Sequence, residues 1–481
     1  MIHRKNVTLY PDNKRVILRP LDHPQESIRY KIIARVLSLT DEQVIEELRK
    51  ILRRFENRHK DFQSYLLKRF ENYSQYLFID SQVSKERKLL IGAYFTQEYS
   101  FESTALFNPS IVPVENQNND SDSTKKYIMS LRATGEGHIS SITFREVYID
   151  ANNNIEVKEA SPFASLPTYI ETKTYEKEFL CKELYEKELL SEISEQVIKY
   201  LPDKFSLDEL KKAVLYVKKR NNINKASQKI LDGIILTALS NYEIEFNEST
   251  ALSERIIFPN SPSEINGIED ARFVKYREQD NEHGKYYATY TAYDGYFVIP
   301  QMIETTDFIH FKIKSLNGSA VQNKGFALFP KKINGKYAML SRQDKENLFI
   351  MYSDQLFFWH DKKIILRPHS SWEFSKVGNC GSPIETEEGW LVLTHGVGSL
   401  KQYSIGAVLL DFEKPEKVIG RLDEPLITPN ENERNGYVPN VVYTCGAVIH
   451  NEHLVIPYAF SDMATTFATV DLKELITKLK K

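Results

Sequence analysis

Two hydrophobic patterns alternate along this chain. From about Asp22 to Gln82, apolar residues recur at three- and four-residue spacing, which predicts amphipathic helices. Clear examples are Val44, Leu48, Ile51, Leu52 and Phe55. Ser38-Leu39-Thr40-Asp41 offers an N-cap followed by an acid at the start of one such helix. Helical spacing returns in a block rich in Lys, Glu and Leu at about 175–240, and again at 471–481.

Between these blocks the pattern is that of short strands. The change comes at Lys88–Phe95, after which β-type runs such as Tyr127–Arg132 and His138–Phe144 are separated by turn residues. From 242 to about 470 the same pattern continues, with turn signals such as Asn334-Gly335. Closely spaced strands predict a sandwich, a barrel or a propeller, and a propeller suits the length best. No strict repeat of a known type is present, so the pattern alone supports a repetitive all-β region.

Length sets the expected number of domains. A chain of 481 residues is too long for one compact core of ordinary size. We therefore expect an N-terminal helical region at 1–87, a β domain at 88–470 that carries the helical insertion at about 175–240, and a C-terminal helix at 471–481.

Composition narrows the classes of partner. The net charge of -3 leaves no general basic field to attract nucleic acid or an anionic membrane. The 3 cysteines form neither a metal-ligand pattern nor a disulfide framework, which fits a reducing compartment. No secretory signal and no apolar run of membrane-spanning length are present. We expect a soluble, cytoplasmic protein that binds neither nucleic acid nor membrane.

The segment Gly267–Phe273 carries the most informative chemistry. Glu269, Asp270 and Arg272 are packed between apolar residues just before a predicted strand. A guanidinium beside a carboxylate at a strand end holds the acid in a defined geometry. Such a cluster is typical of a catalytic acid, and equally of a buried structural ion pair.

A predicted hairpin brings two cations together. Asn334-Gly335 is a strong hairpin signal, and Lys324 and Arg342 stand at the two open ends of the strands that it joins. Like charges side by side cost free energy unless an anion lies between them. The hairpin therefore predicts an anion site, although two solvated surface charges are the alternative.

Other segments place polar residues at strand ends. Asn108 and Ser110 flank a proline, Arg132 precedes two glycines, and His395 ends an apolar strand. Taken singly, each has a structural explanation: a proline-directed turn, a glycine turn with a surface arginine, and a structural histidine. The remaining two candidates are Tyr403 and Asp462.

Together these segments resemble glycoside hydrolase family 130, the β-mannoside phosphorylases and related β-mannosidases. The resemblance covers about Phe107 to Leu472 apart from the helical block. Its most specific pieces, in chain order, are Gly267–Arg272, Asn323–Pro330, Gly389–Val397, Tyr403–Asp411 and Tyr437–Val442.

The resemblance implies a five-bladed β-propeller with the site in its central funnel. It also implies that Asp270 is the proton donor, acting through a sugar hydroxyl, with Ala271 where the family usually has proline. Lys324 stands where several members have arginine, which keeps the charge but loses the two-pronged hydrogen bond. The mannosyl ring is assigned to Asn108, Ser110, Arg132 and Asp462, and phosphate to Lys324, Arg342, His395 and Tyr403.

The choice of nucleophile depends on the charges around it. An inverting enzyme that uses water needs a second carboxylate as base, whereas phosphate is already nucleophilic and needs cations. Phosphate carries roughly -1.5 to -2 charges near neutral pH, which Lys324, Arg342 and His395 with the Tyr403 hydroxyl would balance. The segment 394–406 contains no acid. Phosphorolysis is therefore expected, although Glu136 near Arg132 leaves a water-using variant open.

No cofactor or metal is expected, because the histidines lack ligand spacing; inorganic phosphate is the co-substrate and a β-mannoside oligosaccharide the substrate. Two alternatives stay open: a β-mannosidase of the same fold, and a propeller without catalytic activity that binds glycans or proteins. The helical regions are hypothesised to shape the acceptor side or to form a homo-oligomer contact.

Overall fold

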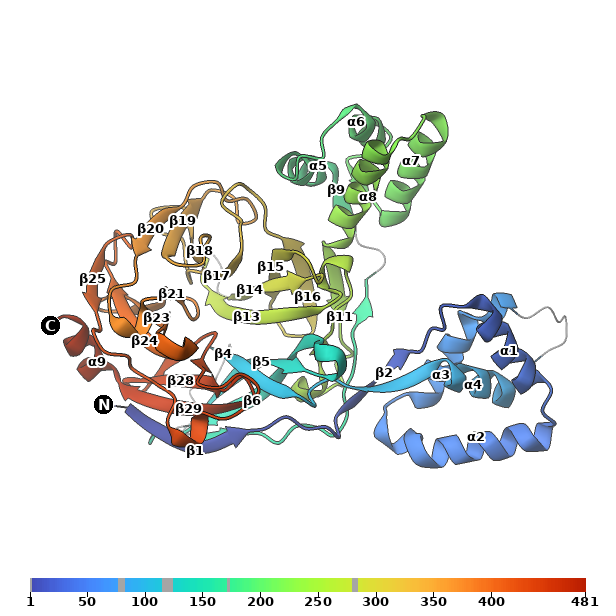
Figure 1. The fold of residues 1–481 in the computed structure, drawn as a ribbon, viewed down its shortest axis with the longest axis horizontal. Coiled ribbons are helices and arrows are strands. Elements are labelled where there is room, and N and C mark those ends of the chain that lie inside the picture. Colours follow the sequence, from blue (N-terminus) through green and yellow to red (C-terminus); the bar gives the residue numbers. More distant parts are fainter. Residues whose placement is uncertain (1, 77–82, 115–123, 171–173, 279–283) are drawn as a thin grey trace.

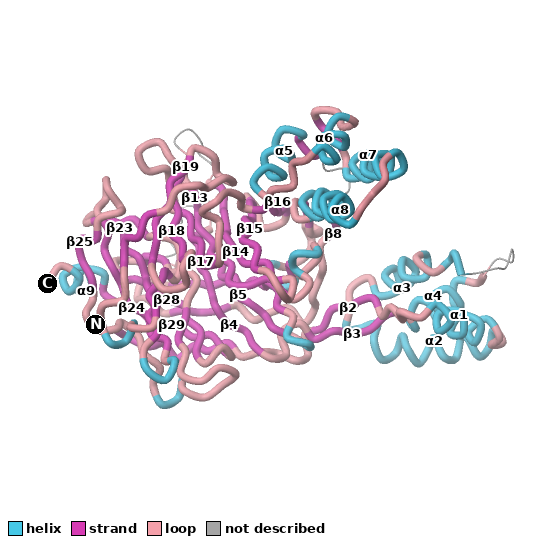
Figure 2. The backbone as a smooth tube through the Cα atoms, turned by 45° about the horizontal axis from the view of Figure 1, so that its top comes forward, coloured by secondary structure: helices cyan, strands magenta, loops and turns pink. Residues whose placement is uncertain are grey.

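A computed structural model describes residues 2–76, 83–114, 124–170, 174–278 and 284–481. The described part is mainly β with helices, as the sequence predicts. Figure 1 shows the sheets lying around a common centre, with two groups of helices projecting from one side of them. The tube view separates the same helical groups from the strands (Figure 2). No helix in these described ranges is both long enough and apolar enough to cross a membrane.

Within the described residues, eleven strands make up the largest sheet, which has two halves. The halves join where Gly267 of β13 pairs in parallel with Ser140 of β6. The first half holds β4 (Ala105–Pro113), β5 (Lys125–Thr134), β6 (Ser140–Ile149), β7 (Ile155–Val157) and β12 (Ile256–Ile257). The second half holds β13 (Gly267–Tyr276), β14 (Lys285–Tyr293), β15 (Val298–Thr305), β16 (His310–Ser315), β11 (Tyr242–Glu245) and β8 (Thr168–Tyr169).

Three smaller sheets follow along the chain. The first holds β17 (Lys324–Leu328), β18 (Tyr337–Arg342), β19 (Leu348–Ser353) and β20 (Lys363–Leu366). The second holds β21 (Lys376–Asn379), β22 (Ile384–Thr386), β23 (Gly389–Val397), β24 (Tyr403–Leu410) and β25 (Val418–Arg421). The third holds β26 (Val442–Tyr443), β27 (Val448–His450), β28 (His453–Phe460), β29 (Ala464–Asp471) and, from the other end of the chain, β1 (Ile2–Leu9).

The start of the chain corrects the predicted N-terminal boundary. Residues 1–87 are not purely helical, because β1 pairs antiparallel with β29 and the chain then enters the first helical group through β2 (Val16–Pro20). It returns through β3 (Thr96–Ser100), which pairs with β2 to form a two-stranded ribbon. The predicted change to strands at Lys88–Phe95 is also wrong: α4 covers Lys85–Tyr94 and is capped by Ser84.

The first helical group is built on the predicted amphipathic pattern. It contains α1 (Glu26–Leu37), α2 (Asp41–Phe55), α3 (Phe62–Glu71) and α4. Thr40 caps α2, as predicted, by accepting a hydrogen bond from the Gln43 backbone. Val44 and Leu48 of α2 are buried inside the group. The last part of the predicted helical stretch, residues 77–82, lies outside the described residues.

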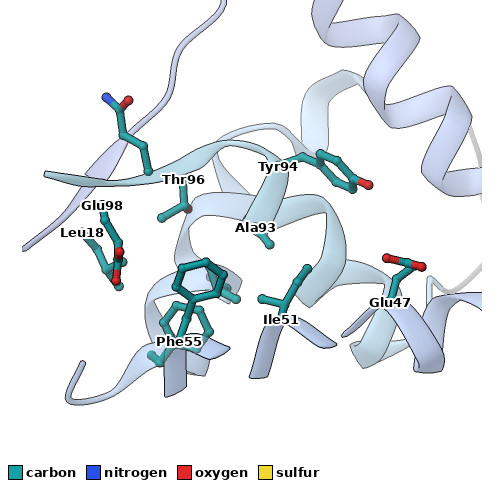
Figure 3. Close-up of a pocket in the computed structure, with 11 residues that line it drawn as sticks. Leu18, Glu47, Ile51, Phe55, Ala93, Tyr94, Thr96 and Glu98 are labelled. Atoms are coloured by element: carbon teal, nitrogen blue, oxygen red, sulfur yellow. The ribbon is translucent and has the colours of Figure 1, made fainter. Parts of the chain in front are cut away.

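An apolar cavity of about 440 Å³ opens between α2, α3 and the β2–β3 ribbon. Figure 3 shows Ile51 and Phe55 reaching into it from α2, with Leu18 and Glu98 on the side of the ribbon. Glu98 is already paired with His59 and Arg58.

The second helical group lies where the sequence predicts it. It contains α5 (Lys177–Glu186), α6 (Glu192–Lys199), α7 (Leu207–Arg220) and α8 (Lys225–Leu239), with a short ribbon of β9 (Tyr175–Glu176) and β10 (Lys204–Phe205). Buried Glu183 of α5 anchors the group to the sheets, since it accepts hydrogen bonds from Asn241 and Asn317. The predicted C-terminal helix is α9 (Leu472–Leu479), capped by Asp471.

Candidate active site

One cavity collects most of the predicted site residues. It has a volume of about 240 Å³, and eight of the nine predicted side chains line it. Those eight are Asn108, Arg132, Asp270, Lys324, Arg342, His395, Tyr403 and Asp462. Its other lining residues are Lys376, Lys401, Val438, Val441 and Tyr443. The residues come from all the sheets that surround the centre of the β region, so the cavity exists only in the folded chain.

Backbone irregularities at three strands aim side chains into this cavity. The register shifts between Phe107 and Ser110 in β4, between Glu269 and Arg272 in β13, and between Lys324 and Ala327 in β17. Each shift contains a residue with positive φ: Asn108 at 48°, Asp270 at 55° and Gly325 at 91°. Bulges of this kind redirect side chains and recur beside active sites.

Asp270 is held from both its side chain and its backbone. Asn108 Nδ2 donates to Asp270 Oδ1 at 2.7 Å. The buried Arg272 donates from Nη1 to the Asp270 carbonyl at 2.9 Å, and from Nη2 to the Tyr443 hydroxyl at 2.8 Å. Arg272 Nη2 also lies 3.9 Å from Asp270 Oδ2, so Arg272 helps to orient the acid, while the carboxyl itself lines the cavity.

Cations around Asp270 keep it ionised. Burial by itself raises the pKa of this carboxyl, but the charges of Arg132, Arg272 and Lys324 outweigh it and hold the pKa well below its ordinary value. Arg132 Nη1 lies 3.3 Å from Asp270 Oδ1, and Arg132 Nη2 lies 2.8 Å from Glu269 Oε1.

Asp462 has the opposite environment. Ser461 and Asp462 both have positive φ in the turn between β28 and β29, which brings Asp462 to the cavity wall. Burial and the negative charge of Asp270 raise the pKa of Asp462 to about 6, against the smaller influence of Arg132, Lys401 and Lys324. Of the two carboxyls on the wall, Asp462 is therefore the one that holds a proton more readily.

The predicted cationic hairpin is confirmed. Lys324 and Arg342 are direct partners across β17 and β18. Lys324 Nζ lies 3.4 Å from Glu269 Oε2, a partner that the sequence did not indicate. Arg342 is buried, and its Nε has no hydrogen-bond partner. A Cβ added to Gly325 would come within 2.6 Å of that Nε, so glycine leaves the space that the guanidinium occupies.

His395 is neutral and supports Arg342. Its Nδ1 lies 3.2 Å from the Asn379 carbonyl, which can only accept, so Nδ1 carries the proton. Its Nε2 therefore accepts from Arg342 Nη1, at 2.9 Å. Burial, and then the charges of Arg342 and Lys376, lower the pKa of His395 well below its ordinary value. Both ring nitrogens are already used.

Lys376 and Lys401 also line the cavity, although the sequence does not predict them as site residues. Lys376 begins β21, and its Nζ lies 4.9 Å from the centre of the Tyr403 ring. Burial first, and then Arg342, Lys324 and Lys401, lower the pKa of Lys376 to about 8. Lys401 lies in the turn before Tyr403 and has positive φ. A single lysine at the start of a short strand or in a turn gives no local signal of a site.

The structure corrects the predicted placement of Ser110 among the residues that contact the mannosyl ring. Its side chain is fully buried and does not line the cavity; its hydroxyl instead accepts a hydrogen bond from the Phe273 backbone N–H at 3.0 Å. Glu136, the acid considered for a water-using enzyme, is exposed in the turn after β5 and is not a lining residue either.

The described residues that line this cavity carry a net positive charge, although the whole chain has a net charge of -3. It presents five cationic side chains and two carboxylates. The geometry can hold an anion and a hydroxylated ligand beside an oriented acid. In the described ranges no group of three or more His, Cys, Asp or Glu residues is placed to hold a metal ion.

Comparison with known proteins agrees with this chemistry. Residues 214–481, more than half of the chain, match the glycoside hydrolase family 130 model, which is described as beta-1,4-mannooligosaccharide phosphorylase. A 1,2-beta-oligomannan phosphorylase of Thermoanaerobacter sp. (strain X514) is 35% identical over 229 residues, which cover 47% of this chain and 75% of that protein.

Two further relatives are beta-1,2-mannobiose phosphorylases. The protein from the same Thermoanaerobacter strain is 37% identical over 228 residues, covering 44% of this chain and 70% of that protein. The one from Listeria innocua serovar 6a is 31% identical over 232 residues, which cover 47% of this chain and 63% of that protein. The chain belongs to glycoside hydrolase family 130.

Proposed function

We propose that this protein is an inverting phosphorylase that cleaves β-mannosides with inorganic phosphate and releases mannose 1-phosphate. One observation carries the proposal: an oriented acid, Asp270, shares a small cavity with an excess of cations. Phosphorolysis needs an acid for the leaving oxygen and a seat for a dianion, and it needs no catalytic base. The names of the relatives, all phosphorylases of β-mannosides, support the same reaction.

The phosphate seat comprises Lys324, Arg342, Lys376 and the Tyr403 hydroxyl. Arg342 lines this seat with a guanidinium, a charged donor that suits a phosphate oxygen. His395 has no free N–H for phosphate in this structure, so we assign it to holding Arg342 in place. This changes the role implied by the family resemblance from a direct contact to a positioning one.

Asn108, Arg132 and Asp462 form the seat for the mannosyl ring. They lie on the β4, β5 and β28–β29 side of the cavity and surround Asp270. A carboxylate and an amide that accept hydrogen bonds, together with a guanidinium that donates them, suit the hydroxyls of a sugar.

Bound phosphate would also favour the protonated form of Asp270. Asp270 must hold a proton before it can donate one, yet nearby cations keep its pKa low when phosphate is absent. A bound dianion offsets the field of those cations, Lys324 among them, and so raises the pKa of Asp270. Proton donation is thereby favoured when the nucleophile is in place.

We also propose that the sheets form a closed five-bladed propeller. Buried apolar layers support this, because they lie between every pair of neighbouring sheets around the centre. The last sheet takes β1 from the chain start and packs against the β4–β6 half through residues such as Val455, Phe467 and Ile111. The proposed catalytic domain thus includes residues 2–9, outside the predicted limits of 88–470.

The test of function is incubation with β-1,2- and β-1,4-mannobiose, with and without phosphate. Mannose 1-phosphate formed only with phosphate supports the proposal. Free mannose formed in phosphate-free buffer would instead make the protein a β-mannosidase, and no reaction with either disaccharide would contradict both. We test the β-1,2 linkage first, because the more similar relatives bear that linkage in their names.

The lowered pKa of Lys376 predicts that phosphate is used less efficiently at alkaline pH. Its lowered pKa, about 8, leaves the ammonium charged below that pH and uncharged above it. We therefore expect kcat/KM for phosphate to fall as pH rises through about 8, while kcat at saturating phosphate stays level. In Lys376→Arg the guanidinium stays charged, so the fall moves to higher pH. An unchanged alkaline limb in this variant would rule out Lys376 as its source.

A further inference from the structure

The size of the cavity leaves part of the substrate outside. Its volume of about 240 Å³ is below the roughly 300–1,000 Å³ of pockets that enclose a whole drug-sized ligand. It therefore does not enclose a disaccharide together with phosphate. If the mannosyl ring and the phosphate occupy it, the sugar on the leaving side must rest at the mouth.

Two exposed rings, His138 and Tyr437, form a stacked pair, and Tyr437 lies next in sequence to Val438, which lines the cavity. His138 and Tyr437 stack with 5.6 Å between ring centres and 28° between ring planes. The Tyr437 hydroxyl lies 3.2 Å from His138 Nδ1, which ties the two rings together. Both side chains are exposed, with Tyr437 at 54%. An exposed aromatic face of this kind is typical of a contact surface.

Backbone contacts place the pair beside the site. Val438, the neighbour of Tyr437, lines the cavity and donates its N–H to the Ser461 carbonyl at 3.0 Å. Ser461 in turn precedes Asp462 on the cavity wall. His138 comes from the turn after β5, the strand that supplies Arg132. The stacked rings thus bridge two neighbouring sheets next to the proposed mannosyl seat.

The turn that carries His138 is held in shape. The Tyr99 hydroxyl donates to the Glu136 carbonyl at 2.6 Å. A Cβ on Gly135 would come within 2.2 Å of the Ser100 carbonyl, so this turn packs directly against the backbone at the end of β3. A platform fixed before the ligand arrives loses little conformational entropy on binding.

We propose that the stacked His138–Tyr437 pair is the platform for the leaving-side pyranose of a β-mannoside oligosaccharide. The ring faces would contact the apolar C–H face of that sugar, while the imidazole edge and the tyrosine hydroxyl face its hydroxyls. This inference rests on the proposed function and adds to it the site for the acceptor.

The test uses the synthetic direction, in which mannose 1-phosphate donates to an acceptor sugar. Tyr437→Ala is expected to raise KM for mannose as acceptor about tenfold, since a lost stacking contact has that effect on binding. KM for mannose 1-phosphate should change less than twofold. Tyr437→Phe keeps the ring and should stay within about threefold of the wild type, which separates stacking from the hydroxyl contact.

Tyr185→Ala is the matched control, because Tyr185 is an exposed tyrosine on α5, outside the cavity lining. Binding of β-1,2-mannobiose, followed by ligand NMR, gives a readout independent of turnover and should weaken in Tyr437→Ala alone. Equal acceptor KM and equal binding in Tyr437→Ala and wild type would overturn the platform but leave phosphorolysis intact. A wild-type protein that neither binds nor cleaves the mannobioses would overturn both.

Discussion

Asp270→Asn is expected to lower kcat for phosphorolysis about a thousandfold, within the ~10²–10⁴ range for loss of a general acid. The amide cannot supply the proton that the leaving oxygen needs. Its size matches that of the carboxyl, and its oxygen can still accept the hydrogen bond from Asn108. Steady-state release of mannose 1-phosphate from mannobiose measures this loss.

Phosphate binding separates a chemical defect from a structural one in this variant. Removing the negative charge of Asp270 leaves the surrounding cations less compensated, so phosphate should bind at least as tightly as to the wild type. Glu136→Gln is the control, since that acid is exposed and does not line the cavity. Full activity of Asp270→Asn would remove the residue from its proposed role.

Arg342→Ala is expected to raise KM for phosphate about a hundredfold, the scale of a lost charge-assisted contact. The truncation removes the whole guanidinium that lines the seat. KM for the mannoside should change little, because the proposed sugar contacts come from β4, β5 and the β28–β29 turn and not from β18. Initial rates at varied phosphate and fixed saturating mannobiose give the two constants separately.

His395→Ala refines this experiment. The guanidinium remains but loses the acceptor that holds Nη1, so phosphate KM should rise by a smaller factor, about tenfold. Arg367→Ala removes an exposed arginine outside the cavity and should leave both constants unchanged. A normal phosphate KM in Arg342→Ala would dismiss the proposed anion seat.

The fold was readable from the sequence wherever the signal was local. Helix α2 follows from apolar spacing and its cap, and the α5–α8 group follows from a block rich in Lys, Glu and Leu. The β17–β18 hairpin follows from Asn334-Gly335, whose residues have φ of 48° and 80°. Lys88–Phe95 was misassigned because a short apolar run fits a strand and a buried helix equally well. The position of β1 was not predictable, since its partner β29 lies at the other end of the chain.

The site residues also divide into those with a local sequence signal and those without one. Asn108 and Ser110 are two residues apart, and in a regular strand they would share a face. The register shift between Phe107 and Ser110 breaks that alternation, so Asn108 faces the cavity while Ser110 turns to the Phe273 backbone. Nothing in the local sequence revealed this bulge, and nothing marked Lys376 as part of the anion seat.

By itself, the sequence determined the β-rich class, the two helical groups, the cationic pairing of Lys324 with Arg342, and the acid beside an arginine, because each depends on neighbours in the chain or across one turn. Only the tertiary structure decided that Asn108, Arg132 and Asp462 meet Asp270 and that His395 bonds to Arg342. The stacking of His138 on Tyr437 was likewise decided by the tertiary structure. These depend on contacts between separate sheets, whose positions follow from packing of buried layers that no local pattern encodes.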